Sequence, residues 1–408
     1  MGQRKPVIAF VINSIGEGGA ERALSTILSA RARRNFYDVH LILLDDLPDA
    51  RLMPDTVTRH VLDGRQGFVR SLAALTLTLR RIRPALTVSF LVRANVCNAI
   101  ASRLSGGAAI VCERMHLGSH LDGRYRGARR AVARLLPRIS YGLADGILGV
   151  SAGVSRNLVE EFGAAESKVA TINNPYDLES IRREGRQAPD IALPDQFILA
   201  VGRLAPSKNF HQLIQSYLAS SLQVPLLILG EGPQRAGLER LIADAGAADR
   251  VRLLGFTARP FPVMARAMFT VSASLNEGFP NAMVEAMALG TPVVSSDCRS
   301  GPSEILADRE RGPVSGIVQA EYGILVPEAQ PALLAAAMEL MARPEIRQHY
   351  SAQALRRSQD FHVDAIAEQY WACFDRIAQG RAVASSRVRT RTRRAAAAPP
   401  TGPGGGDG

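Results

Sequence analysis

Cysteine is scarce in this sequence, and the few cysteines are far apart. They are Cys97, Cys112, Cys298 and Cys373. No two of them stand at the short spacing of a metal-ligand or redox pair, which argues against a disulfide-framed secreted fold. We therefore expect a protein of the reducing cytoplasm.

Long apolar runs are also missing. No stretch approaches the roughly eighteen uninterrupted apolar residues that a transmembrane helix needs. Arg4 and Lys5 precede an apolar run at 7–12, as in a signal peptide, but this run is too short and is broken from Asn13 on. We interpret it as a buried first strand. The expected location is cytoplasmic, either soluble or peripheral on the cytoplasmic face of the inner membrane.

Aromatic residues are few, whereas small aliphatic residues are common. The 408 residues are 47% hydrophobic but only 5% aromatic. Such a composition, rich in Ala, Leu and Val, is typical of helices packed on buried strands. The length exceeds what one hydrophobic core usually organises, so we expect two domains.

Positive charge is in excess, with a formal net charge of +11. Part of it lies in the tail, at Arg387, Arg389, Arg391, Arg393 and Arg394. Another part is expected on one amphipathic helix, at Arg124, Arg126, Arg129, Arg130, Arg134 and Arg138. Basic surfaces attract nucleic acid and anionic membranes alike, and a plain solvated basic face is the alternative.

Short apolar runs alternate with helical stretches along most of the chain. The expected strands are 7–12, 39–44, 86–90, 109–112 and 146–150, and then 197–201, 226–229, 251–254, 269–272 and 292–295. This pattern predicts an α/β protein with two doubly wound parallel sheets and a ligand cleft between them. The expected divisions are a domain at 1–180, a linker at 181–194, a domain at 195–362, a helix at 363–380 and a disordered tail at 381–408.

Glycine-rich turns follow several of the expected strands. Gly18 and Gly19 come after the first strand and open a helix, and Gly230 and Gly232 follow a strand of the second half. Glycines at a helix N-terminus let backbone amides approach a phosphate. Each turn by itself is equally well explained as an ordinary tight turn between a strand and a helix.

Two basic residues follow another strand end. Arg203 and Lys208 stand after the strand at 197–201, where a planar guanidinium and a compact ammonium can hold a diphosphate. The alternative is a solvated basic loop, since Arg and Lys are common there.

The segment from Glu277 to Glu285 is the most informative. Pro280, Gly290 and Pro292 predict a helix over about 280–289. Glu277 then lies before the helix, Gly278 and Phe279 present amides at its N-terminus, and Glu285 lies inside it. Pro280 begins the helix. Amides suit a phosphate, and carboxylates accept hydrogen bonds from sugar hydroxyls, although an isolated pair of glutamates needs no shared purpose.

His116 follows the strand at 109–112 and is expected near the cleft, where it contacts a transferred group or guides an acceptor. Most isolated histidines do neither. No cluster of His, Cys and Asp and no Asp-x-Asp predicts a bound metal, so Arg203, Lys208 and helix dipoles are expected to balance a diphosphate's charge.

Taken in order, these motifs resemble glycosyltransferase family 4, a group of retaining enzymes with the GT-B fold. The matching segments are Gly18 to Arg22, Gly202-Arg203 with Lys208-Asn209, Gly230 to Pro233, Glu277 to Glu285, Gly301 to Glu304 and Ile172 to Pro175. The resemblance implies a hexosyltransferase with two facing Rossmann-like domains, the first on the acceptor side. Only the tail beyond about residue 380 lies outside it.

The resemblance also implies roles for individual residues. Gly18 and Gly19 would border the donor diphosphate and sugar, and Arg203 and Lys208 would bind the diphosphate. Glu277 would contact the sugar without acting as a nucleophile, and Glu285 would bind the ribose. His116 matches a family position near the sugar.

The expected donor is a nucleotide sugar, with a UDP-hexose or UDP-N-acetylhexosamine favoured over GDP-mannose, and no cofactor is expected. The acceptor would be a glycan or lipid-linked molecule of bacterial surface polysaccharide or lipid-linked oligosaccharide synthesis, with peripheral contact to an anionic membrane and no specific nucleic acid. A UDP-sugar 2-epimerase of similar fold and a non-enzymatic polyanion-binding protein remain the alternatives.

Overall fold

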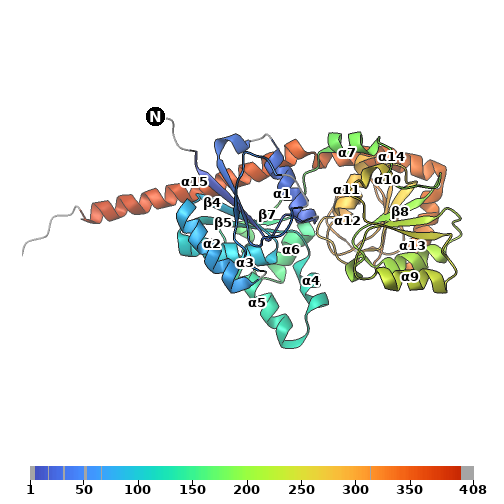
Figure 1. The fold of residues 1–408 in the computed structure, drawn as a ribbon, viewed down its shortest axis with the longest axis horizontal. Helices are drawn as coiled ribbons and strands as arrows, with labels where there is room; N and C mark the ends of the chain where they lie inside the picture. The colour runs from blue at the N-terminus through green and yellow to red at the C-terminus, as the bar shows by residue number, and fades with distance from the viewer. Residues whose placement is uncertain are drawn as a thin grey trace, which may run out of the picture.

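The computed structural model describes residues 5–16, 18–30, 33–49, 53–65, 67–312 and 314–396, with their side chains up to residue 380 apart from four positions. Within these residues the chain forms two seven-stranded sheets. Figure 1 shows the two sheet domains side by side, with the last helix running back along the first domain. The fold class predicted from the sequence is thus confirmed.

The first domain contains a fully parallel sheet in the order β3-β2-β1-β4-β5-β6-β7. Its strands are β1 (Val7–Ile12), β2 (Asp38–Leu43), β3 (Thr58–Val61), β4 (Leu86–Phe90), β5 (Ala108–Glu113), β6 (Gly146–Gly149) and β7 (Val169–Thr171). Its helices are α1 (Gly19–Ser29), α2 (Phe68–Ile82), α3 (Val92–Ser105), α4 (Leu117–Arg124), α5 (Gly127–Leu143) and α6 (Ala152–Glu160), with short 3-10 turns at Arg33–Phe36 and Glu166–Lys168.

The second domain repeats this plan in the order β10-β9-β8-β11-β12-β14-β13, and only β13 runs antiparallel. Its strands are β8 (Ile198–Val201), β9 (Leu226–Leu229), β10 (Val251–Gly255), β11 (Phe269–Ser272), β12 (Val293–Ser296), β13 (Val318–Gln319) and β14 (Ile324–Val326). Its helices are α7 (Leu178–Gly185), α8 (Phe210–Leu218), α9 (Arg235–Asp244), α10 (Phe261–Met264), α11 (Asn281–Ala288), α12 (Pro302–Leu306), α13 (Pro331–Ala342) and α14 (Pro344–Ser358), with 3-10 turns at Pro206–Lys208 and Gln359–Phe361.

Both strand orders reverse in the middle of the sheet, between β1 and β4 and between β8 and β11. In open α/β sheets, ligands bind outside the carboxyl ends of the strands at such a reversal. The loops after β1, β8 and β11 carry the glycine pair at 18–19, Arg203 with Lys208, and Glu277 respectively. The topology therefore places these sequence motifs at the ligand-binding edges.

Four strands were not predicted from the sequence. They are β3, β7, β13 and β14, and each spans at most four residues. β3, β7 and β13 are largely exposed or half-buried and lack an apolar run, while β14 is buried but only three residues long. Such segments pair because a neighbouring strand offers its free edge, which is a tertiary effect.

The first part of the segment expected as a linker, 181–194, is helical. α7 occupies Leu178–Gly185, with Asp177 Oδ1 accepting a hydrogen bond from Ser180 N at 2.8 Å as the helix cap. Leu178 and Ile181 are buried, and α7 packs against α10 and α11. This helix forms because its apolar residues are buried against the second domain.

The last helix, α15 (Val363–Ala396), continues beyond its expected end at 380 and covers 381–396 of the segment expected as a tail. That stretch has no proline and is rich in Ala and Arg, which are strong helix formers. The rest of the predicted tail, 397–408, lies outside the described residues.

α15 crosses back to the first domain and completes its core. Trp371 and Phe374 are fully buried and pack edge-on against Phe10 of β1, with ring centroids 6.0 and 5.7 Å apart. The C-terminal helix thus belongs to the first domain by packing, although it follows the second in sequence.

The basic helix expected from Arg124 to Arg138 is two helices. Arg124 ends α4, and Tyr125 and Arg126 have extended backbones before α5 begins at Gly127. Gly127 has a positive φ of 55°, a conformation that favours glycine and breaks the helical run. Among the described helices, none is both long and apolar enough to cross a membrane.

Candidate active site

The glycine turn after β1 lies directly against the start of α11 in the other domain. A Cβ atom at Gly19 would be 2.5 Å from Asn281 Nδ2, so the Asn281 side chain would have to shift to admit it. Gly18 caps α1 with an extended backbone. The turn therefore uses glycine to let the two domains approach, and its backbone reaches the N-terminus of α11.

Glu285 points from α11 toward the first domain. Its carboxylate forms an ion pair with Arg22 of α1, and only 5% of the residue is exposed. The Arg22 guanidinium also lies 5.9 Å from the centre of the Phe261 ring. Arg22 had no predicted role, because only the folded structure brings positions 22 and 285 together.

Lys208 and Glu277 form the second charged pair. Lys208 Nζ lies 2.5 Å from Glu277 Oε1, and the backbone oxygen of Glu277 accepts a hydrogen bond from Ser300 Oγ at 2.6 Å. Both side chains line a small cavity of about 40 Å³ together with Pro280 and Asn281. The two charges that the sequence assigned to one donor site are thus in contact.

Arg203 is exposed on the same loop as Lys208, and no carboxylate among the described residues pairs with it. The glycines of the next turn support this loop. A Cβ atom at Gly230 would lie 1.9 Å from Gly202 O, and one at Gly232 would lie 2.5 Å from Leu204 O. Gly230 and Gly232 thus have a clear packing role, which places the backbone around Arg203.

The start of α11 has a tight fit against the loop that follows β5. A Cβ atom at Gly278 would be 2.1 Å from Arg114 O. Phe279 is buried and packs edge-on against Phe361, with centroids 5.2 Å apart. Pro280, expected as the first helical residue, is the N-cap residue of α11, which begins one position later at Asn281.

His116 caps α4 and borders a different, larger space. Its Nδ1 atom accepts a hydrogen bond from Ser119 N at 3.3 Å. Burial lowers the pKa of His116, while nearby Glu161 opposes the shift. The imidazole therefore favours its neutral form at neutral pH.

The larger space is a cleft of about 550 Å³ between the domains. Its lining includes His116, Arg156 and Asn157 from the first domain and Arg299 and Arg311 from the second. The structure places His116 here, whereas Lys208 and Glu277 line the small cavity. Of the predicted site residues, Lys208, Glu277 and Pro280 thus border the small cavity, and His116 borders the larger cleft.

Several contacts at this interface were not predicted. Asn281 Oδ1 accepts hydrogen bonds from Asn174 Nδ2 at 2.6 Å and from Tyr176 OH at 2.7 Å. Arg114 donates to Asn174 Oδ1 and, at 2.7 Å, to Tyr370 OH. The Asn173-Asn174-Pro175 segment was a sequence signal, but its partner at 281 was not.

Glu304, in the turn at 301–304, reaches across to the first domain. Its carboxylate accepts hydrogen bonds from Ala152 N at 2.6 Å and Gly153 N at 3.0 Å, at the start of α6. A carboxylate at a helix N-terminus is favoured by the helix dipole. This turn therefore holds the two domains together beside the cleft. Among the described residues, no group of three or more His, Cys, Asp or Glu side chains could hold a metal ion.

Solved structures with the same two-sheet arrangement define its class as the GT-B fold. Anabaena Alr3699/HepE, solved with UDP-glucose, superposes with a TM-score of 0.69 at 21% identity, covering 91% of this chain and 99% of that chain. Family descriptions match both halves: "Glycosyltransferase Family 4" over residues 17–180 and "Glycosyl transferases group 1" over residues 181–357.

Curated relatives agree with these matches. The N-acetylgalactosamine-N,N'-diacetylbacillosaminyl-diphospho-undecaprenol 4-alpha-N-acetylgalactosaminyltransferase of Campylobacter jejuni is 32% identical over 75% of this chain and 84% of its own length. The lipopolysaccharide core biosynthesis glycosyltransferase LpsE of Rhizobium meliloti is 28% identical over 75% of this chain and 83% of its own length. The chain belongs to glycosyltransferase family 4, and the resemblance seen in its motifs is confirmed.

Proposed function

We propose that this glycosyltransferase transfers a hexose or N-acetylhexosamine from a UDP-sugar to a glycan or lipid-linked acceptor, with retention of the anomeric configuration. The observation that carries the proposal is the Lys208–Glu277 contact beside the start of α11. There an ammonium suited to a diphosphate and a carboxylate suited to sugar hydroxyls meet at a helix N-terminus.

The donor would lie along α11. Arg203 and Lys208 take the diphosphate, Glu277 holds sugar hydroxyls, and Glu285 holds the ribose. In the structure, Glu285 forms an ion pair with Arg22, and Glu277 forms one with Lys208. On donor binding, Glu285 would exchange Arg22 for the ribose, and Lys208 and Glu277 would exchange each other for phosphate and sugar. Because the ion pairs already hold these side chains at the site, the side chains would move little.

Transfer with retention needs no carboxylate nucleophile in this proposal. The acceptor hydroxyl attacks the anomeric carbon from the face that the diphosphate leaves, and a phosphate oxygen takes its proton. Arg203, Lys208 and the dipole of α11 stabilise the leaving diphosphate, which makes a metal ion unnecessary. Neutral His116 lies in the neighbouring cleft, where it can accept or donate a hydrogen bond to the sugar or acceptor.

The relatives support the acceptor class. The Campylobacter enzyme is named for a diphospho-undecaprenol acceptor and the Rhizobium enzyme for the lipopolysaccharide core. Alr3699/HepE was solved with UDP-glucose. We therefore place this chain in bacterial surface polysaccharide or lipid-linked oligosaccharide synthesis, at the cytoplasmic face of the inner membrane.

The test is a transfer assay with purified full-length protein. UDP-glucose, UDP-galactose and their N-acetylated counterparts are each offered with undecaprenyl-diphosphate-linked mono- and disaccharides, and the products are identified by mass. NMR of the new linkage reports retention, and EDTA reports metal dependence. We expect one donor to extend one acceptor with retention in EDTA. Interconversion of UDP-sugars without any acceptor would favour the 2-epimerase alternative and overturn the proposal.

A thermal-shift screen, done before the transfer assay, identifies the nucleotide base of the donor. UDP, GDP and ADP are compared at equal concentration, because a ligand that binds only the folded state raises the unfolding temperature by mass action. UDP is expected to give the largest shift. A larger shift with GDP would contradict the choice of donor but not the transferase activity.

A further inference from the structure

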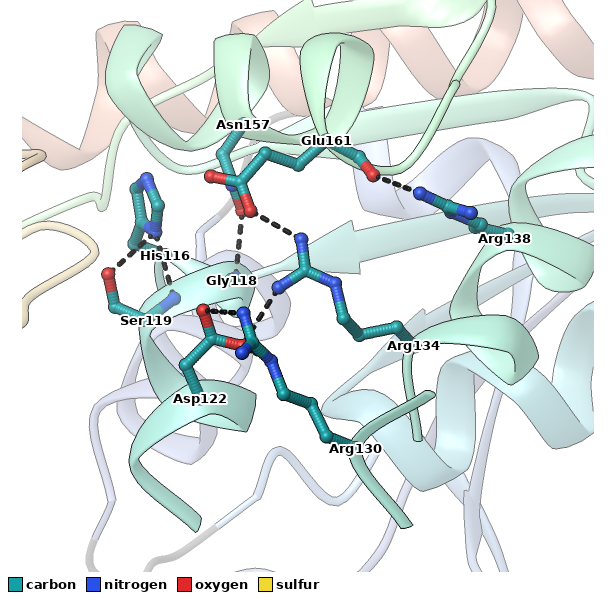
Figure 2. A network of polar contacts seen from close by, with 9 residues as sticks. All are labelled: His116, Gly118, Ser119, Asp122, Arg130, Arg134, Arg138, Asn157 and Glu161. Atoms are coloured by element: carbon teal, nitrogen blue, oxygen red, sulfur yellow. Dashed lines mark hydrogen bonds and ion pairs between the residues drawn. The ribbon is translucent and has the colours of Figure 1, made fainter. Parts of the chain in front are cut away.

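The imidazole of His116 borders the interdomain cleft and is held on one side. Its Nδ1 atom lies 3.3 Å from Ser119 N and 3.1 Å from Ser119 Oγ. Within the part of the chain that the structure describes, Ser119 is the one residue that hydrogen-bonds to the ring. Figure 2 shows Nδ1 toward Ser119 and the other ring nitrogen, Nε2, turned away from it. Nε2 is therefore the ring nitrogen that a ligand in the cleft can contact.

The donor at Nδ1 determines where the ring carries its proton. Ser119 stands at the third position of α4, where a backbone N–H has no acceptor within the helix. An amide can only donate, so Nδ1 must offer its lone pair, and the one proton of a neutral imidazole then lies on Nε2. With the proton on Nδ1, two donors would face each other and the helix amide would lose its acceptor.

The surroundings of His116 keep the ring neutral. Burial lowers the pKa of His116, and the residue is only 6% exposed. Glu161 opposes this shift of the pKa, whereas Arg299 and Arg311, which line the cleft from the second domain, add to it. At neutral pH the relevant form is therefore a neutral tautomer and not the imidazolium.

Neighbouring helices fix the helix that carries Ser119. At the start of α4, Gly118 N donates a hydrogen bond at 3.2 Å to Oδ1 of Asn157 on α6, a residue that is 3% exposed. Near the end of α4, Asp122 pairs with Arg134 of α5 at 2.9 Å (Figure 2). α4 is thus held at both ends, which gives Ser119 a fixed place beside the ring of its own cap residue.

We propose that Ser119 is a positioning residue, which fixes His116 in the Nε2–H tautomer and so makes it a hydrogen-bond donor to an oxygen of the bound sugar or acceptor. The Ser119 hydroxyl adds a second donor to the one that the backbone gives to Nδ1. The inference rests on the proposed function for the ligand, and it narrows the role of His116 to donation. In this tautomer the ring has no free lone pair for the proton of the acceptor hydroxyl, which passes to a phosphate oxygen of the leaving group.

The position of the ring proton is measured by ¹⁵N NMR of the full-length protein with labelled histidine, at about pH 8.5, where a histidine is neutral. The signal of His116 is assigned from its absence in His116→Gln. We expect a protonated Nε2 and an unprotonated Nδ1 in the wild type. In Ser119→Asp the carboxylate beside Nδ1 can only accept, and its charge-assisted hydrogen bond is stronger than that of the amide, so the proton should move to Nδ1.

Transfer rates test the consequence of the proton's position. Ser119→Ala should lower kcat about threefold to tenfold, the net contribution of one hydrogen bond, and Ser119→Thr, which keeps the hydroxyl, should transfer as the wild type does. Ser119→Asp should lower kcat about tenfold or more, although an acidic residue stabilises the first turn of a helix, so a purely structural role predicts no such loss.

Ser180→Ala is the matched control. Ser180 holds the same position in α7, and its N–H is likewise donated to the side chain of the cap residue, Asp177, at 2.8 Å. This variant should transfer at the wild-type rate. The shift of the unfolding temperature by UDP, measured on every variant, shows that each is folded and that its donor site is intact.

The tautomer is read without turnover, so its failure and the failure of the proposed function are told apart. A proton on Nδ1 in the wild type overturns the inference. So does a Ser119→Asp variant that transfers faster than the wild type, because its carboxylate would then make His116 a better base. Wild-type rates in both Ser119→Ala and Ser119→Asp overturn it as well.

Discussion

At the scale of single residues, the candidate site is defined by charges that meet only in the folded chain. Lys208 and Glu277 lie 69 positions apart in sequence and touch in the structure, and Arg22 and Glu285 lie 263 positions apart. A half-buried charge is tolerable when its partner is close, because the partner replaces the water that burial removes. The pairs thus hold these side chains in fixed orientations at the candidate site.

Arg203→Ala and Lys208→Ala should each strongly reduce sugar transfer. Each removes a positive charge that would stabilise the leaving diphosphate, which costs on the order of 3 kcal/mol, or about a hundredfold in kcat/KM. Initial rates with saturating acceptor measure this loss. Arg240→Gln, an exposed arginine far along α9, is the control and should turn over normally. Near-normal rates in both alanine variants would remove these residues from the site.

Glu113 should make stability fall as pH rises. It is 1% exposed beneath the loop that carries His116, and burial raises its pKa to about 7, although hydrogen bonds from Asn95 and Tyr141 oppose the shift. The unfolded carboxyl loses its proton near its ordinary value of 4.5, so ionisation increasingly favours the unfolded chain from there up to about pH 7. The full penalty then persists at higher pH.

Glu113→Gln cannot ionise and should escape this penalty. Relative to the variant, the wild type is expected to lose about 3 kcal/mol between pH 5 and pH 8, at about 1.4 kcal/mol for each pKa unit. Thermal unfolding across that range measures the difference. For the control Glu345→Gln, at an exposed position on α14, stability should change with pH as it does in the wild type. A constant offset between Glu113→Gln and the wild type at all pH values would contradict the prediction.

At the scale of elements, the loops that follow the strands pack closely against one another, because glycines at the contacts have no side chain. The turn after β9 lies so close to the turn after β8 that Gly230 and Gly232 leave no space for a methyl group. Gly278 does the same between the start of α11 and the loop after β5. Backbones that touch in this way position each other rigidly, so the groups they carry keep a fixed geometry.

Gly232→Ala should impair the donor site through its neighbour. The added Cβ atom would lie 2.5 Å from Leu204 O, a backbone atom that cannot move without displacing Arg203. We expect kcat/KM to fall about tenfold to a hundredfold and stability to drop by about 1–3 kcal/mol. UDP titration and transfer rates measure the effect.

Gly237→Ala is the matched control on α9. A Cβ atom there meets nothing within 4 Å, and alanine favours a helix over glycine by up to about 1 kcal/mol. It should leave transfer unchanged and stabilise the protein slightly. If both alanine variants behave alike, the close packing of the two turns does not position Arg203.

At the scale of the whole molecule, two separate parts of the chain form the first domain: its N-terminal half and the C-terminal helix α15. α15 leaves the second domain and packs Ile366, Tyr370, Trp371 and Phe374 into the core beneath β1 and β4. A separate core cluster runs across the interface and joins residues such as Leu117 and Tyr176 to Phe279 and Met283. The two domains are therefore coupled both by a shared core and by a crossing helix.

Phe374→Ala should destabilise the N-terminal domain although the residue stands near the C-terminal end. Phe374 is fully buried, and losing such a ring costs about 3–5 kcal/mol. Trp371, the one tryptophan of the sequence, lies 5.5 Å from the Phe374 ring and reports unfolding by fluorescence. A chain ending after residue 380 keeps these contacts and should unfold as the full chain does. An unchanged midpoint for Phe374→Ala would mean that α15 does not pack there in solution.

The sequence by itself determined the architecture and indicated many residues of the candidate site. Ten strands were predicted close to their observed positions, because apolar runs and the turn residues between them are local signals. The helix after Glu277 was predicted from Pro280 and Gly290 for the same reason, and it spans Asn281–Ala288. Glycines and basic residues at strand ends indicated the edge of the sheet that carries the candidate site, because parallel strands end at a common edge.

Only the tertiary structure decided which of these residues meet. No local signal linked Arg22 to Glu285, Asn281 to Asn174, or Glu304 to the start of α6. α7 and residues 381–396 of α15 were not predicted as helix, because helices of weak pattern depend on what they pack against and on their continuation from a stable segment. Sequence periodicity reports the face that a segment buries, whereas the partner of that face is chosen by contacts between distant parts of the chain.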